Sequence, residues 1–371
     1  MLFNTKIEAR SNNNLRTSCF GPVKKTLKDK TMADLKTHYM GLELKNPIII
    51  GASNIVTNID NLKRIEKAGA AAIVYKSLFE EQVQLENLEL YERKTEYSER
   101  NAEMISLYPE SKSESSDILE HLVALKKAKE SVTIPVFASI NAVLHETWVE
   151  YAKKIEETGV NGLELNFYSI PEKVDKESED IEKEQIKILR DVKSAVNIPV
   201  SVKLSPYYTN PLKHISDLGK AGADAFVLFN RLFQPDIDIH TEEHQFPYSL
   251  SNNEDNRLPL RFAGLLYGNT NASICANTGI MTGSDVVKMI LAGADCVQIV
   301  STVYLNQIEV ISPMIEVIGK WMDSKGYKTI NSFRGKLSKK NSENKLPYYR
   351  AQYMDFMMTT SQILKKYKII N

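Results

Sequence analysis

The chain has no excess of charge of either sign and no long hydrophobic run. Its 371 residues contain 47 Lys and Arg against 47 Asp and Glu, so nothing in the charge balance indicates a nucleic-acid or membrane-surface partner. No apolar run is long enough to span a bilayer, and the N-terminal region has no apolar segment of the kind found in signal peptides. We therefore expect a cytoplasmic protein whose partner is a small-molecule substrate, with no nucleic acid and no membrane.

Cysteine is scarce, and its spacing excludes several kinds of site. The chain contains only Cys19, Cys275 and Cys296, without a CxxC pair. Cys275 and Cys296 fall within apolar stretches that are typical of core strands. This pattern predicts free, buried thiols in a reducing compartment and argues against disulfides or an iron–sulfur site in this chain.

The two ends of the chain differ in pattern from its middle. Residues 1–33 are polar and basic without periodicity, and we interpret them as a disordered or spurious N-terminal extension. Residues 34–340 show regular alternation of strand-like and helix-like segments. Residues 341–371 form a polar C-terminal extension. With 43% hydrophobic and 25% charged residues, the chain as a whole has enough apolar material for one large core.

Eight short apolar runs alternate with helical patterns along the middle segment. Three Ala-Gly-Ala repeats, at 68–70, 221–223 and 292–294, each close a helix and open an apolar strand. This order predicts an α/β fold, a (β/α)8 TIM barrel with long loops after strands 2, 4 and 6. A doubly wound open sheet is the alternative, but it needs a glycine-rich first turn, which the segment 51–54 is not. The predicted strands cover 47–52, 71–75, 135–140, 163–167, 199–204 and 225–229, and two more end at Ala276 and Val300.

Polar residues follow nearly every predicted strand, at the end where barrel enzymes place their sites. They are amides, hydroxyls and two lysines, Lys76 and Lys203, with no carboxylate at a strand end. A hard metal ion needs carboxylate ligands, so we predict no metal site. The loops after strands 7 and 8 are a common phosphate site in barrels, and here they carry Thr278, Gly279, Ser301 and Thr302. The ring suits a planar, negatively charged ligand with many carbonyl and N–H groups.

Several ordered motifs of the barrel segment resemble the class 1 dihydroorotate dehydrogenases and the pyrimidine-site domain of dihydropyrimidine dehydrogenases. The resemblance extends from about residue 35 to about residue 339. The matching pieces are Asn46-Pro47 with Gly51-Ala52-Ser53, Lys76-Ser77, Glu164-Leu165-Asn166, Val202-Lys203-Leu204, Asn277-Thr278-Gly279-Ile280, Gly293-Ala294 with Val297-Gln298-Ile299, and Phe333-Arg334-Gly335-Lys336-Leu337.

The resemblance implies an FMN-dependent dehydrogenase in which a base removes a proton from one substrate carbon while hydride passes from its neighbour to the flavin. By resemblance, Lys203 stabilises the reduced flavin, Lys76 lies near flavin and substrate, and Asn166 and Asn230 hold the pyrimidine ring. A homodimer is also implied. The implied cofactor contacts are Ala52, Ser53, Lys76, Ser77, Asn141, Asn166, Lys203, Asn277, Thr278, Gly279, Ser301 and Thr302.

The loop after the fourth strand departs from the family pattern. Ser169 occupies the position of the catalytic cysteine of class 1 enzymes, in the sequence Phe167-Tyr168-Ser169-Ile170-Pro171. A serine base needs a helper, because a free hydroxyl is a poor base. We expect catalytic roles for Ser169, Lys203 and Lys76, acting on dihydroorotate or a related dihydropyrimidine. Two alternatives remain open: a degenerate flavin-binding homologue with a different substrate, and a non-redox barrel enzyme that binds a phosphate ester.

Overall fold

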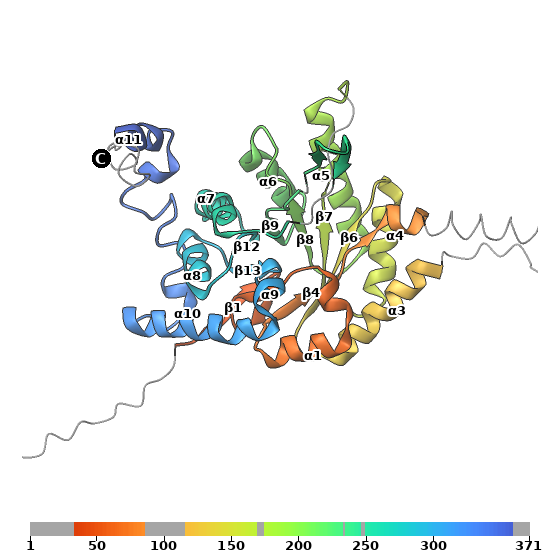
Figure 1. Ribbon diagram of the computed structural model, residues 1–371, viewed down its shortest axis with the longest axis horizontal. Coiled ribbons are helices and arrows are strands. Elements are labelled where there is room, and N and C mark those ends of the chain that lie inside the picture. The colour runs from red at the N-terminus through yellow and green to blue at the C-terminus, as the bar shows by residue number, and fades with distance from the viewer. Residues whose placement is uncertain (1–32, 86–115, 169–173, 233, 246–248, 359–371) are drawn as a thin grey trace, which may run out of the picture. The chain divides into compact units, whose positions relative to one another are not determined.

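Eight parallel strands form a closed barrel in the computed structural model, which describes residues 33–85, 116–168, 174–232, 234–245 and 249–358 (Figure 1). Each strand pairs with its neighbours in parallel, and the pairing of Ile73 with Val136 closes the ring. The predicted TIM barrel is therefore confirmed. The barrel strands are β3 (Ile48–Ile50), β4 (Ala72–Val74), β6 (Val136–Asn141), β7 (Gly162–Asn166), β8 (Val200–Leu204), β9 (Ala225–Leu228), β12 (Ser273–Asn277) and β13 (Cys296–Ile299).

Helices lie outside the strands and cover them (Figure 1). Their ends follow from local chemistry: the Asn58 side chain accepts hydrogen bonds at the start of α1, and Thr282 and Asp285 form a capping box at the start of α8. The helices packed on the barrel bury an apolar face, as in α1, where Leu62 and Ile65 are fully buried. The helices are α1 (Ile59–Lys67), α3 (Ser116–Ser131), α4 (His145–Glu156), α5 (Ser178–Ala195), α6 (Pro211–Lys220), α7 (Arg257–Leu266), α8 (Gly283–Ala292), α9 (Ser301–Asn306), α10 (Ile311–Lys325) and α11 (Gln352–Met358).

The Ala-Gly-Ala repeats lie where helices turn into strands, as predicted. Gly293 follows α8 with φ at +136°, a backbone conformation that favours glycine. A Cβ at this position would lie 2.5 Å from Cβ of Tyr267, so the absence of a side chain also allows close packing. The repeat therefore ends a helix and brings it close to the next element.

A short hairpin closes the amino-terminal end of the barrel. Strands β1 (Thr37–Tyr39) and β2 (Leu42–Leu44) pair antiparallel. Thr37 Oγ1 donates to the Asp295 carbonyl at 2.7 Å, and the Tyr39 ring packs edge-on against Phe137 with centroids 5.5 Å apart. In the described part of the chain, buried side chains such as Thr37 and Tyr39 thus cover the end of the barrel opposite the carboxyl ends of the strands.

The segment 232–272, predicted as a long insertion, contains regular structure. It holds a small hairpin of β10 (Asp236–Asp238) and β11 (Glu243–Gln245), followed by α7. Helix α7 packs against both α8 and β12, in the place of the helix that follows the sixth barrel strand. Its buried face includes Ala263 and Leu266, but Pro259 and Gly264 within the helix are residues that commonly interrupt a helical pattern.

The segment after α10 packs back onto the barrel. Arg334 forms an ion pair with Asp295, and the Gly335 and Leu337 amides donate to the last carbonyls of α8. Cys275 and Cys296 are free and buried, as predicted, whereas Cys19 lies outside the described residues.

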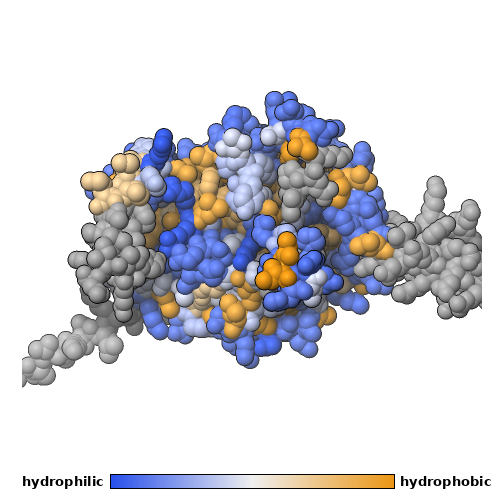
Figure 2. Space-filling view, turned by 45° about the horizontal axis from the view of Figure 1, so that its top comes forward, coloured by the Kyte–Doolittle hydropathy of each residue, from blue (hydrophilic) through white to orange (hydrophobic). Residues whose placement is uncertain are grey.

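The surface shown in Figure 2 is largely hydrophilic, with hydrophobic residues in separate patches. Among the residues that the structure describes, no helix combines the length and hydropathy needed to cross a membrane.

Candidate functional site

A cavity of about 320 Å³ opens at the carboxyl ends of the barrel strands, and none of its described lining residues is an Asp or Glu. Twelve of the predicted site residues line it: Ala52, Ser53, Lys76, Ser77, Asn166, Lys203, Asn230, Asn277, Thr278, Gly279, Ser301 and Thr302. The fold thus brings together residues from seven barrel strands or the loops that follow them. Ser169 lies outside the described residues, so the structure does not test its predicted role.

Asn141 is the one described member of the predicted set that does not line the cavity. It ends β6 and is buried next to β5 (Leu78–Phe79), a short strand that extends the sheet beside the barrel. Phe79, its partner in that pairing, lines the cavity. Ser139, two residues earlier on β6, contacts the site indirectly, since its Oγ lies 2.8 Å from Oγ of the lining residue Ser77.

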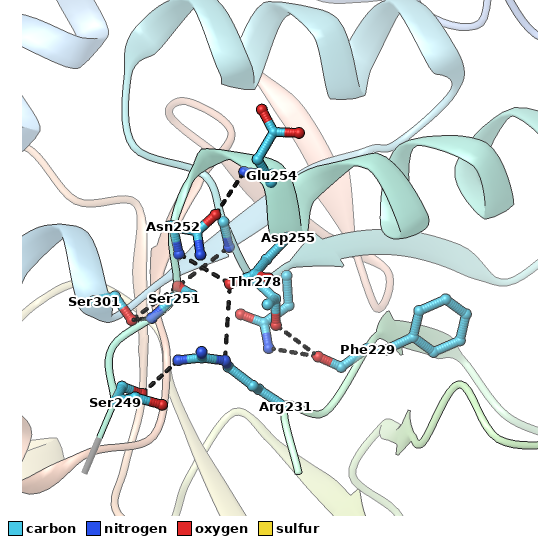
Figure 3. A network of polar contacts seen from close by, with 11 residues as sticks. Phe229, Arg231, Ser249, Ser251, Asn252, Glu254, Asp255, Thr278 and Ser301 are labelled. Atoms are coloured by element: carbon cyan, nitrogen blue, oxygen red, sulfur yellow. Dashed lines mark hydrogen bonds and ion pairs between the residues drawn. The ribbon is translucent and has the colours of Figure 1, made fainter. Parts of the chain in front are cut away.

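The turn after β12 has a backbone that requires special residues. Gly279 has φ at +72°, and a Cβ there would lie 2.6 Å from the Asn252 carbonyl oxygen and closer still to the Asn256 amide. Thr278 also has a positive φ, +78°, which is uncommon outside glycine. Its Oγ1 donates to the Phe229 carbonyl at 2.9 Å, a contact that offsets part of the conformational cost (Figure 3).

Hydroxyl and amide groups meet at this end of the cavity, which we name the phosphate end (Ser251, Thr278, Gly279, Ser301 and Thr302). Ser251 and Ser301 hydroxyls lie 2.9 Å apart, and the Ser251 amide donates to Ser301 Oγ at 3.0 Å (Figure 3). The Gly279 amide points to Ser251 Oγ at 3.3 Å. These small neutral dipoles suit an anionic group. Thr302 Oγ1 instead donates to the Ile280 carbonyl, so that hydroxyl supports the turn.

Sequence reasoning missed the segment 249–251 and Arg231 as lining residues. Arg231 Nε lies 3.8 Å from Asp255 Oδ2, and its guanidinium also donates to the Ser249 carbonyl (Figure 3). Asp255 in turn accepts from the Asn252 amide at 2.9 Å. Arg231 therefore holds the segment 249–255 against the barrel, a contact between distant positions that no local pattern indicates.

A second group of lining residues, which we name the substrate end, consists of larger side chains: Lys76, Asn166, Tyr168, Lys203 and Asn230. Asn230 Nδ2 donates to Asn166 Oδ1 at 2.7 Å, so the two predicted substrate residues, from different strands, form one buried pair. Their remaining donors and acceptors are oriented by this bond.

The two lysines have different surroundings. Lys203 is buried, and its Nζ lies 3.8 Å from Oε1 of the fully buried Glu164. Lys76 is less buried and lies near His121. Burial, together with the charge of Lys76, lowers the pKa of His121 to about 4, so this ring is neutral at physiological pH.

A family model described as dihydroorotate dehydrogenase matches residues 34–322, which include the whole cavity. The chain belongs to the dihydroorotate dehydrogenase family. It is an oxidoreductase, and members of this family depend on a flavin. The family resemblance inferred from the motifs at the strand ends is thereby confirmed.

Curated relatives cover most of the chain. The catalytic subunit of dihydroorotate dehydrogenase B (NAD(+)) from Thermoplasma acidophilum is 27% identical over 315 residues, covering 82% of this chain and 99% of the relative. The protein of the same name from Methanocaldococcus jannaschii is 26% identical over 300 residues, covering 76% and 92%. Dihydroorotate dehydrogenase A (fumarate) from Lactobacillus helveticus is 27% identical over 209 residues, covering 55% and 68%.

Proposed function

We propose that this protein binds FMN across the cavity and uses it to oxidise dihydroorotate or a closely related dihydropyrimidine. The observation that carries the proposal is one cavity with two unlike ends, a neutral hydroxyl- and amide-lined phosphate end and a substrate end with two lysines. Its volume, about 320 Å³, lies in the range of small-molecule sites. FMN supplies the hydride acceptor when bound.

The described residues fit a ligand with both polar and anionic parts. Ser53 Oγ and Gln298 Oε1 are buried side-chain atoms of the cavity lining with no hydrogen-bond partner in the described structure. Unpaired buried polar atoms are costly, so atoms of this kind in a cavity wall indicate contacts that a ligand completes. In this proposal, the Gly279 turn and Ser301 hold the FMN phosphate, and Ser53 and Ser77 border the ring system.

Lys203 provides the charge that the reaction needs. A flavin ring that accepts a hydride gains negative charge, and an ammonium fixed near it stabilises that charge. The Asn166–Asn230 pair orients the pyrimidine ring, and Lys76 lies where it contacts both ligands. Ser169 is our proposed proton acceptor, because the described chain reaches the cavity wall at Tyr168, one residue before it.

Two observations favour a second candidate, a related flavin enzyme whose substrate is another planar ring. The loop that holds Ser169 departs from the class 1 pattern, and the bulky Tyr168 lines the cavity. Both features change the space offered to the substrate.

Anaerobic titration separates these possibilities. Purified protein loaded with FMN should show a visible flavin absorbance band, and addition of dihydroorotate should bleach it. Bound flavin that dihydroorotate does not bleach would favour the second candidate. A protein that takes up no FMN would contradict both.

We further propose that the protein acts in the cytoplasm in pyrimidine biosynthesis and forms a homodimer. The two buried free thiols support a reducing compartment. Light scattering coupled to size-exclusion chromatography tests the dimer, and a monomeric mass would contradict it. The names of the relatives include both NAD(+) and fumarate. Reoxidation of the reduced protein by each acceptor in turn would identify the one it uses.

A further inference from the structure

A buried carboxylate lies behind the cavity wall. Glu164, on β7, has a side chain that is 1% exposed, and it does not line the cavity. Its Oε2 accepts a hydrogen bond from Gln298 Nε2 at 2.7 Å, whereas Oε1 has no hydrogen-bond partner within the described structure. An ionised carboxylate this deeply buried requires a compensating charge. Lys203 Nζ, 3.8 Å from Oε1, provides it.

The bond between Glu164 and Gln298 crosses the interior of the barrel. The strand order places β13 and β7 four positions apart in a ring of eight, on opposite sides. Because an ionised carboxylate only accepts hydrogen bonds, the Gln298 amide must direct its N–H to Glu164. Its Oε1 then remains unpaired next to Gly51, where an added Cβ would lie 3.4 Å away. Gln298 thus fixes the carboxylate from across the barrel.

The geometry leaves the Lys203 ammonium available to a ligand. A separation of 3.8 Å is too long for a hydrogen bond but short enough for strong charge attraction in a buried place. Lys203 lines the cavity, and Glu164 lies behind it. Glu164 therefore compensates the charge of the ammonium from behind the cavity wall. The N–H donors of Lys203 remain available on the cavity side.

Other charged and titratable groups around Lys203 do not replace this carboxylate. Lys76 and Arg231, which line the same cavity, are cations and oppose protonation of Lys203. Near Glu164, burial raises the pKa of the Tyr39 hydroxyl well above its usual range. Burial also raises the pKa of the Cys296 thiol. Both are neutral at physiological pH. Glu164 is therefore the one anion facing Lys203 in the described part of the chain.

We propose that Glu164 is a positioning residue that keeps Lys203 protonated and directed at the flavin, held in place by Gln298. The inference rests on the proposed FMN site. Its consequence is a pH dependence. Without the carboxylate, Lys203 is a desolvated cation with no anion facing it in the described part of the chain, so a variant without Glu164 should lose this charge at lower pH than the wild type.

Sulfite binding to the FMN-loaded protein tests this without turnover. Sulfite adds to oxidised flavin, the adduct is anionic, and bleaching of the visible band reports its affinity. We compare Glu164→Gln with wild type from about pH 6 to about pH 10. The ratio of the two dissociation constants removes the titration of sulfite itself. We expect this ratio to rise by about tenfold towards high pH, which corresponds to one pKa unit.

Two controls separate charge from structure. Glu80→Gln removes another carboxylate, one that is only 3% exposed, accepts hydrogen bonds from the Val143 and Leu144 amides and does not line the cavity. For this variant, the ratio of the sulfite dissociation constants to those of wild type should not change with pH. In Glu164→Gln with Lys203→Arg the guanidinium cannot lose its proton, so the ratio should again be flat. A flat ratio for Glu164→Gln alone would overturn the inference.

Failures of the two proposals are distinguishable. If wild-type protein binds no FMN, the proposed function is wrong, and the inference falls with it. If Glu164→Gln does not load FMN, the wild-type titration decides. A lysine that titrates below about pH 9 overturns the inference, and one that remains charged to about pH 10 supports it.

Discussion

The phosphate end and the substrate end of the cavity are built in different ways. At the phosphate end, backbone amides and small hydroxyls are positioned by turns such as the one at Gly279, where any side chain would collide with the neighbouring segment. At the substrate end, long side chains such as Lys203 and the Asn166–Asn230 pair are positioned by one another. A turn of this kind tolerates few substitutions, whereas side chains can be exchanged singly. This difference explains how the chain keeps the family's cofactor motifs and departs from its pattern in the loop after β7.

The largest effect should come from the substrate end. Lys203→Ala removes the cation that stabilises the reduced flavin, and we expect flavin reduction to slow by on the order of 10² to 10³-fold while the protein still folds. Anaerobic stopped-flow absorbance measures the rate. Lys193→Ala is the control, because Lys193 pairs with Asp224 outside the cavity and should leave reduction unchanged. Equal rates for wild type and Lys203→Ala would remove the proposed role.

At the phosphate end, a substitution that disturbs the backbone of the turn should weaken FMN binding. Gly279→Ala places a Cβ against the Asn252 carbonyl and the Asn256 amide, and we expect FMN affinity to fall by about a hundredfold, or about 3 kcal/mol. Gly41→Ala is a matched control, since Gly41 has φ at +78° and no atom within 4 Å of the added Cβ. It isolates the conformational cost from the collision. Similar FMN affinities in the two variants would contradict this view of the turn.

A smaller effect is expected from the asparagine pair. Asn230→Ala leaves the Asn166 carbonyl oxygen without its 2.7 Å donor, and we expect KM to rise by about tenfold with FMN affinity unchanged. Steady-state kinetics and flavin titration measure the two quantities. A separate variant, Asn141→Ala, tests the predicted cofactor contact of Asn141, a residue that does not line the cavity. Unaltered FMN affinity in this variant would exclude Asn141 as a cofactor contact.

Arg231 should have the smallest effect and should show which end it serves. Its partners, the Ser249 carbonyl and Asp255, belong to the segment beside the phosphate end. Because this ion pair is partly exposed, we expect Arg231→Met to weaken FMN binding by only about threefold, with KM unchanged. Asp255→Asn should have the same effect. A rise in KM instead would assign Arg231 to the substrate.

Local patterns in the sequence were sufficient for the barrel and for most of the lining. Each strand is a short apolar run, and each carries its polar residues at its own carboxyl end, so closure of the ring necessarily collects them. Helix α7 was not predicted because Pro259 and Gly264 interrupt its pattern. Asn141 does not line the cavity, because β5 pairs with the end of β6, a pairing that a reading of one strand at a time does not include.

The sequence by itself therefore determined the fold, the family and the strand-end residues, since these depend on spacing along the chain. Only the tertiary structure decided which charges meet. Glu164 and Gln298 are 134 positions apart, and Arg231 and Asp255 belong to segments without a common periodicity. Contacts of this kind depend on the diameter of the barrel and on side-chain direction, and neither leaves a local signal. The role of Ser169, which lies outside the described residues, remains a prediction from the sequence.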